Sequence, residues 1–316
     1  MRVPKRSTLA YANEHRPWRL YEAVFYQLLS RCQQQARSGR RKFRFKHKLL
    51  SIDGTMIELC LSMFDWAAYQ RAKGAVKLHL VLDHDGYLPC YAVLTDGKGS
   101  EVGVARSIGF QPGTMVVFDR GYNGYDWWMS LSRGKVGFVT RLKDNTSYGV
   151  VEQREVPAHG NILLDEVILL TSQQEIGPEA RLRRIEVWVE ERQERMVFVT
   201  NNLKLAASTI AAIYKQRWQI ELFFKALKQS LKIKTFVGTS ENAVQIQIWT
   251  ALIAMLLLKY LQLRSSFGWS LSNLVALLRQ QLFVYRDLMT WLNDPFQAPP
   301  ALAGIQDGQL KLEFAQ

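Results

Sequence analysis

The chain has 316 residues, of which 48% are hydrophobic and 11% aromatic, so it can bury a sizeable core and is not a disordered protein. Its 41 Lys and Arg residues outnumber 28 Asp and Glu residues, and the net charge of +13 indicates a polyanionic partner, with nucleic acid as the first candidate. A basic protein without such a partner remains the alternative. Three cysteines without a CxxC pair indicate neither a disulfide framework nor a zinc site, which favours a reducing cytoplasm.

The first part of the chain predicts a basic arm followed by antiparallel strands. We expect residues 1–15 to be irregular and residues 18–35 to form a helix. The basic, aromatic-containing run at 37–48 is either a nucleic-acid contact or a solvated loop. Strands follow at 49–55, 76–82 and 87–94, and a hairpin turn at 83–86 joins the last two.

The next elements alternate between helices and strands. They are a helix at 102–108 that starts near Ser100, a strand at 114–118, a short helix at 125–131 and a strand at 136–141. The predicted order is therefore βββαβαβ, an α/β arrangement with a mixed sheet. Residues 145–199 alternate in a strand-like manner and predict a β-rich insertion.

The last part of the chain predicts helices. The segment Ile213 to Leu231 lacks Pro and Gly, and Ser208 and Thr209 can cap its start. Further helices are predicted at 243–263, 271–282 and 287–292. The segment 243–263 has the composition closest to a membrane span, but its purely apolar run is too short, which favours a buried core helix and no membrane partner.

Four polar residues recur along one side of the helix at 213–231. At about 100° per residue, Tyr214, Arg217, Glu221 and Lys228 fall within roughly 60° of arc, beside an apolar stripe. Arg217 and Glu221 also have the spacing of an ordinary surface ion pair, which is the simpler interpretation. The choice depends on other carboxylates in the chain.

Two of these carboxylates follow predicted strands. Asp53 ends the first strand and Asp119 follows the fourth, so both can meet Glu221 at one edge of the sheet. Three clustered carboxylates repel one another unless cations neutralise them, and oxygen ligands select Mg²⁺ or Mn²⁺. Two such ions would support attack at a phosphodiester, with Arg217 and Lys228 on phosphate oxygens and Tyr214 as a further donor.

The spacing Tyr214-x₂-Arg217-x₃-Glu221-x₆-Lys228 resembles the Tyr-Arg-Glu-Lys signature of the bacterial insertion-sequence transposases of family four, within the DDE group. The resemblance extends through the motifs at 51–55 and 117–122 and covers about residues 45–265.

This resemblance implies a ribonuclease-H-like core with a β-rich insertion. It implies that Asp53, Asp119 and Glu221 bind the metals and that Tyr214, Arg217 and Lys228 hold the phosphates near the cut. Some members hold a flipped base with aromatic residues, which makes Trp218 and Trp188 candidates. Arg120 either reaches a phosphate or pairs with Asp119.

We divide the chain at the limits of these predicted parts. They are a basic N-terminal helical arm at 1–44, the first part of the core at 45–144, the insertion at 145–200, the second part of the core at 201–265, and C-terminal helices with a tail at 266–316. The family's separate end-binding domain is not expected here, because only about 45 residues precede the core.

We expect a metal-dependent cut-and-paste transposase that acts on DNA, as a homodimer in its DNA complex. The alternatives are an inactive DNA-binding remnant of a transposase and a structure-specific nuclease on the same fold.

Overall fold

The computed structural model describes residues 4–36, 48–59, 68–70, 73–157, 159–171, 180–230 and 236–296. Most of the basic run predicted at 37–48 lies outside these residues. Five strands form the core of the sheet, in the spatial order β4-β3-β1-β5-β6. They are β1 (Leu49–Leu59), β3 (Lys73–Asp83), β4 (Leu88–Asp96), β5 (Met115–Phe118) and β6 (Gly137–Arg141).

The directions of these strands are mixed. β3 is antiparallel to both β1 and β4, whereas β1, β5 and β6 are parallel neighbours. This order and these directions confirm the predicted α/β, ribonuclease-H-like core. A short edge strand, β2 (Ala68–Gln70), pairs with β3 and was not predicted.

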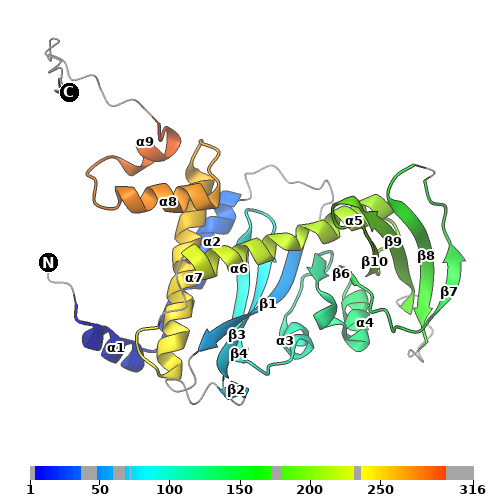
Figure 1. Ribbon diagram of the computed structural model, residues 1–316, viewed down its shortest axis with the longest axis horizontal. Coiled ribbons are helices and arrows are strands. Elements are labelled where there is room, and N and C mark those ends of the chain that lie inside the picture. The colour runs from blue at the N-terminus through cyan, green and yellow to red at the C-terminus, as the bar shows by residue number, and fades with distance from the viewer. Residues whose placement is uncertain are drawn as a thin grey trace, which may run out of the picture.

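The β-rich stretch continues the same sheet (Figure 1). It contains β7 (Tyr148–Gln153), β8 (Ile162–Leu170), β9 (Leu182–Val189) and β10 (Glu194–Thr200). β10 is antiparallel to β6 and also to β9, so the sheet runs from the core through β10 to β7 at its far edge. The stretch is therefore hydrogen-bonded to the core.

Helices cover both faces of the sheet. α3 (Glu101–Ser107) and α4 (Tyr125–Arg133) pack with one face, and Ser100 caps α3 as expected. The other face carries α2 (Trp18–Ala36), α5 (Ala207–Gln216), α6 (Trp218–Ser230) and α7 (Glu241–Arg264). Strand alternation produces the division, because Leu80 packs with α6 and α7 while its neighbour Val81 faces the α4 side.

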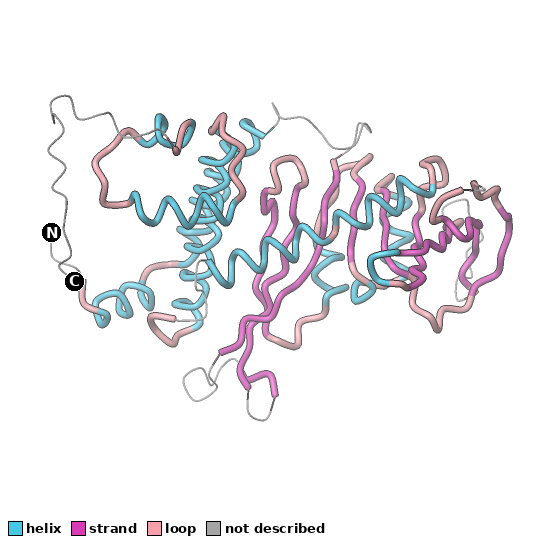
Figure 2. Tube along the Cα trace, turned by 45° about the horizontal axis from the view of Figure 1, so that its top comes forward, coloured by secondary structure: helices cyan, strands magenta, loops and turns pink. Residues whose placement is uncertain are grey.

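The predicted helix at 213–231 is interrupted at Arg217, between α5 and α6, and Leu231 lies outside the described residues. The junction has tight three-residue hydrogen bonds, from Arg217 N to Tyr214 O and from Ile220 N to Arg217 O. The two halves still run in line across the sheet (Figures 1 and 2). The predicted cap was wrong, because the helix starts after Ala206 without a side-chain cap.

The N-terminal residues do not form an irregular arm. Residues 6–15 form helix α1 (Arg6–His15), and Asn13 donates a hydrogen bond to the carbonyl of Val237 at 3.0 Å. α2 packs on α7, where the ring of Trp18 stacks on Trp249 with centroids 6.4 Å apart. This packing was not predicted, because helical periodicity shows an apolar face without identifying its partner.

α7 is long and apolar enough to cross a membrane by length and composition, and 56% of its most apolar window is buried inside the protein. This burial agrees with the predicted core helix. Beyond it, α8 (Leu271–Gln281) and α9 (Leu288–Asn293) share a small core that includes Trp269 and Trp291.

Candidate functional site

Asp53 and Asp119 lie at neighbouring points of the sheet. In the parallel pairing of β1 with β5, Ile52 is opposite Phe118, and each aspartate is the next residue. Both aspartates point to the face covered by α5 and α6. Asp119 is two residues after Val117, which packs with α5, so alternation places both on the same face. Asp53 is opposite Leu80 in the pairing of β1 with β3, and Leu80 packs with α6. The sheet thus places two carboxylates side by side beneath these helices.

The backbone holds each of these carboxylates. Gly54 N donates to Asp53 Oδ1 at 2.8 Å, and Arg120 N donates to Asp119 Oδ1 at 2.6 Å. Asp119 thereby caps the short 3-10 helix η2 (Arg120–Tyr122). One oxygen of each carboxylate is engaged in this way.

Arg217 connects the sheet to helix α6. Its Nη1 donates to Asp53 Oδ2 at 3.2 Å, and its Nη2 donates to Glu221 Oε1 at 2.5 Å. The side chains of Arg217, Asp53 and Glu221 are 15, 17 and 32% exposed, so solvent screens these ion pairs less than surface pairs. The predicted pair with Glu221 is confirmed, and the contact with Asp53 is an addition.

The three carboxylates influence one another. Burial is the main cause that raises the pKa of Asp53 to about 6; Arg217 and the Gly54 N–H oppose this shift, and the negative charges of Asp119 and Glu221 add to it. Burial lowers the pKa of Arg217, but its interactions with Tyr214, Asp53 and Glu221 outweigh burial, so the pKa of the guanidinium is raised overall. The result is a partly buried site in which one guanidinium contacts two carboxylates, Asp53 and Glu221, while Asp119 lies on the adjacent strand.

The ring of Tyr214 lies against the guanidinium of Arg217. Its side chain is only 8% exposed and packs against Phe198, with ring centroids 4.6 Å apart. The guanidinium carbon of Arg217 lies 5.8 Å from the centre of its ring, within cation–π range. Burial raises the pKa of the Tyr214 hydroxyl.

The other predicted site residues are placed differently. Trp218 is 49% exposed beside Arg217, and Arg120 is exposed without an ion pair to any described residue. Lys228 is half-buried on α6, seven residues after Glu221, which is about 10 Å along the helix. Trp188 on β9 is not brought to the site, because alternation places it on the face opposite Val187, which packs with Tyr214.

The donor chemistry suits a hard divalent cation, since all three groups offer carboxylate oxygens. In the described part of the chain, however, no three Asp, Glu, His or Cys side chains are close enough to chelate one ion. Arg217 supplies the positive charge between Asp53 and Glu221 instead.

A polar cluster behind the site was not predicted. The hydroxyl of Tyr122 is buried without a hydrogen-bond partner among the described residues, and it lies 3.3 Å from where a Cβ on Gly54 would stand. Lys77 Cε would be 3.0 Å from that Cβ. A side chain at position 54 would therefore press on these neighbours and move Asp53. The Asp-Gly pair in the sequence is the only signal of this constraint.

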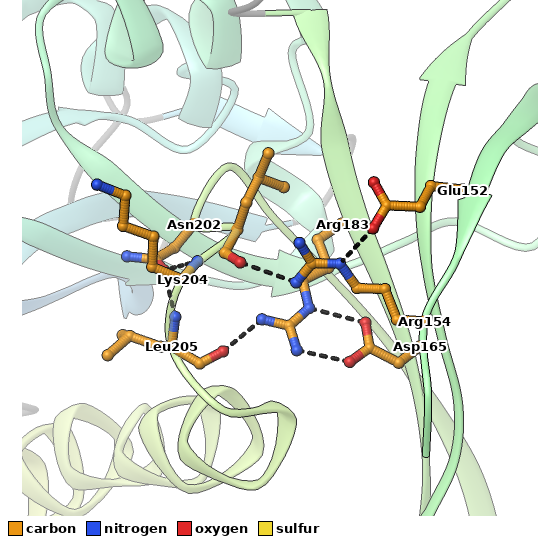
Figure 3. Close-up of polar contacts among 8 residues, drawn as sticks. Glu152, Arg154, Asp165, Arg183, Asn202, Lys204 and Leu205 are labelled. Atoms are coloured by element: carbon orange, nitrogen blue, oxygen red, sulfur yellow. Dashed lines mark hydrogen bonds and ion pairs between the residues drawn. The ribbon is translucent and has the colours of Figure 1, made fainter.

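The insertion holds the segment that leads into α5 (Figure 3). Arg183 on β9 forms a two-pronged ion pair with Asp165 on β8, at 2.7 and 2.5 Å, and both side chains are buried. Its remaining nitrogen donates to the carbonyl of Leu205, and Arg154 donates to the carbonyl of Leu203 at 2.8 Å. We call these contacts the arginine clamp. Spacing in the sequence gives no indication of it.

Comparisons with known proteins show which family the chain is similar to. Residues 44–257 match the family described as Transposase DDE domain. The chain is 33% identical over 290 residues to y4zB of Sinorhizobium fredii, a protein named as a transposase, with 90% of this chain and 79% of that protein covered. It is 28% identical over 257 residues to a Geobacillus stearothermophilus protein named as the transposase for insertion sequence element IS5377, with 81% and 67% covered.

A solved structure of the piggyBac transposase synaptic complex with hairpin DNA aligns over 84% of this chain and 60% of that chain, at 12% identity and a TM-score of 0.42. The family match at residues 44–257 spans more than half of the 316 residues. The chain therefore belongs to the transposases with a DDE domain, which are enzymes that act on DNA.

Proposed function

We propose that this chain is an insertion-sequence transposase that cuts DNA at the ends of its element and joins them to new DNA, with Asp53, Asp119 and Glu221 as its catalytic carboxylates. The observation that carries the proposal is the double contact of Arg217, which ties the strand carboxylate Asp53 to the helix carboxylate Glu221. Asp119 completes the group from the adjacent parallel strand.

The family generally uses divalent metal ions, and we propose two Mg²⁺ or Mn²⁺ ions held by the same three carboxylates. When bound, such ions activate the attacking oxygen and stabilise the leaving oxygen of an in-line displacement. Arg217 neutralises and orients Asp53 and Glu221, and Tyr214 in turn supports the guanidinium. Burial keeps bulk water away from these charges and strengthens their interactions.

The partner that we propose is DNA at the ends of the element and at the target, bound in the bacterial cytoplasm. The net charge of +13 favours a polyanion. Arg217 and Lys228 would contact phosphates near the cut, and Trp218 would stack on a base, which its 49% exposure beside Arg217 supports. We further propose that two copies of the chain act together on the DNA.

The test is metal-dependent nicking of supercoiled plasmid by purified protein in Mn²⁺. We expect Asp53→Asn, Asp119→Asn and Glu221→Gln each to reduce nicking more than about 100-fold, because loss of a metal ligand exceeds the cost of losing its outer-shell support. Asp126→Asn is the matched control, because this carboxylate is 97% exposed on α4.

Unchanged nicking in all three variants would overturn the assignment of the carboxylates. Salt-sensitive DNA binding without any metal-dependent nicking by the wild-type protein would identify a DNA-binding remnant. Cutting of flaps or junctions without joining of ends would identify a structure-specific nuclease.

A further inference from the structure

The charge along one edge of the sheet changes sign next to the carboxylates. β5 and β6 are parallel neighbours, so their carboxyl ends lie at the same edge, with Asp119 and Arg120 after β5 and Arg141 and Lys143 at the end of β6. Asp53 is level with this edge but does not end β1 as predicted, because β1 continues to Leu59. Ligands of open α/β sheets commonly bind at this edge.

A hollow lies at the positive part of this edge. It has a volume of about 450 Å³ and is lined by Arg120, Gly121, Lys143, Asp144 and Asn145. We call it the β6-end hollow. The side chains of Arg120 and Lys143 are exposed, and neither forms an ion pair within the part of the chain that the structure describes. The hollow is thus lined by two cations that have no ion pair among the described residues, by the amide of Asn145 and by one carboxylate, Asp144.

We infer that the β6-end hollow binds a backbone phosphate of the DNA strand adjacent to the phosphate that is cut, with Lys143 as its main cation. This inference rests on the proposed function. Neighbouring strands lie about 4.8 Å apart, and nucleotides rise about 3.4 Å, so the hollow lies one or two nucleotides from Asp119. Arg120 suits a forked contact with phosphate, and the Asn145 amide can donate another hydrogen bond.

If the hollow binds a phosphate, a lysine at the carboxyl end of β6 should contribute to DNA binding, whereas a lysine at its other end should not. The chain has a lysine at each end, so the two can be compared. Lys143 follows the strand at its carboxyl end, whereas Lys135 precedes it at the opposite end and is also exposed. Lys135 has a φ of 56°, a conformation that asparagine tolerates. Lys143→Asn and Lys135→Asn therefore remove the same charge at opposite edges of the sheet.

The experiment measures the affinity of each variant for a fluorescein-labelled 30-base-pair duplex by anisotropy, without metal, between 50 and 300 mM KCl. We expect Lys143→Asn to weaken binding about three- to tenfold at 50 mM and to reduce the slope of log K against log salt by about 0.9, the value for one lost phosphate contact. Lys135→Asn should match the wild-type slope, and Lys143→Arg should retain most of the affinity.

Position is tested with duplexes that carry one neutral methylphosphonate at successive sites around the mapped nick. A neutral group one or two nucleotides from the nick should weaken binding of the wild-type protein but not of Lys143→Asn. The inference would be overturned if Lys143→Asn and Lys135→Asn had equal salt slopes. It would also be overturned if no methylphosphonate position weakened binding of the wild type without weakening binding of Lys143→Asn. The proposed function would still stand if the carboxylate variants lost nicking, so the two failures are distinguishable.

Discussion

Asp53 combines burial with a negative charge, and this combination affects stability as well as chemistry. Burial raises its pKa from 3.8 to about 6, despite the contact with Arg217. The folded protein therefore binds the Asp53 proton more tightly than the unfolded chain does. The stability that this tighter proton binding gives to the fold is complete below the unfolded pKa near 4 and is lost as the pH rises through 6. Ionised Asp53 therefore destabilises the fold at neutral pH.

Asp53→Asn should consequently stabilise the protein while it removes nicking. At about 1.4 kcal/mol per pKa unit, we expect the free energy of unfolding to increase by up to about 3 kcal/mol at pH 8. The gain should grow between pH 4 and 6 and then stay constant. Urea denaturation at several pH values measures it, with Asp126→Asn as a control expected to stay within about 0.5 kcal/mol of the wild type.

A loss of stability at pH 8 in Asp53→Asn would contradict this expectation. It would mean that the contact between Arg217 and Asp53 outweighs the burial of the carboxylate.

The residues of the site differ in how well the sequence predicts them. Spacing of i,i+4 on a helix predicts the contact of Arg217 with Glu221. The contact with Asp53 joins residues 164 positions apart, and no local pattern contains it. The buried hydroxyl of Tyr122 behind Gly54 likewise depends on how β1 packs over η2.

Among the elements, the helix pair α5 and α6 shows how tertiary packing overrides a local pattern. The segment has no Pro or Gly, so nothing in it predicts an interruption at Arg217. α5 packs on the core it shares with β10, whereas α6 packs on the core of β3 and α7. Each half follows its own core, and the junction at Arg217 accommodates the difference.

The strands were predicted where alternation or an apolar run is strong, as in the core and in β8 and β9. β2 was missed because three residues are too few to show alternation. The pairing of β10 with β6, which joins the insertion to the core, was also beyond prediction, since alternation identifies a strand but not its neighbours.

The arginine clamp connects the insertion to the segment that leads into α5, and any effect of this contact on nicking can be separated from its effect on stability. Arg183→Met alone leaves Asp165 buried and unpaired, which should cost about 3–5 kcal/mol. Arg183→Met combined with Asp165→Leu replaces the pair with apolar groups, which is often neutral for stability. Only the hold on the carbonyl of Leu205 is then lost.

We expect this double variant to keep a near-native melting temperature but to nick plasmid about 10- to 100-fold more slowly, because small displacements of a catalytic group have effects of that size. Lys215→Ala is the control, since its pair with Glu191 also joins α5 to the insertion but is exposed, with 74 and 66% of the two side chains accessible. Wild-type nicking by the double variant would show that the clamp contributes only to stability.

At the scale of the whole molecule, the two ends of the described chain meet on α7. Phe25, Leu29 and Cys32 of α2 lie in the same core as Trp249 and Leu256 of α7, more than 200 residues later. The predicted N-terminal arm is therefore part of the helical side of the core. Composition predicts that such a core exists, but only the fold determines which helices share it.

The C-terminal helices present an apolar surface with no cover from the described residues. In the turn between α8 and α9, Phe283 and Tyr285 are fully exposed, while Leu282 and Val284 are 64 and 51% exposed. Four consecutive exposed apolar residues are unusual on a protein that acts alone. Together with the proposed pairing of two copies on DNA, this turn is the surface at which we expect them to meet.

Phe283→Asp with Tyr285→Asp should therefore abolish the two-copy complex on DNA, because two charges would be buried without partners in the interface. Light scattering after gel filtration with a 30-base-pair duplex measures the mass. The wild type should carry two chains and the variant one, with similar melting temperatures because both side chains are exposed. Val150→Asp, at a 50% exposed site on β7, is the matched control and should retain two chains. A variant complex that still contains two chains would place the interface elsewhere.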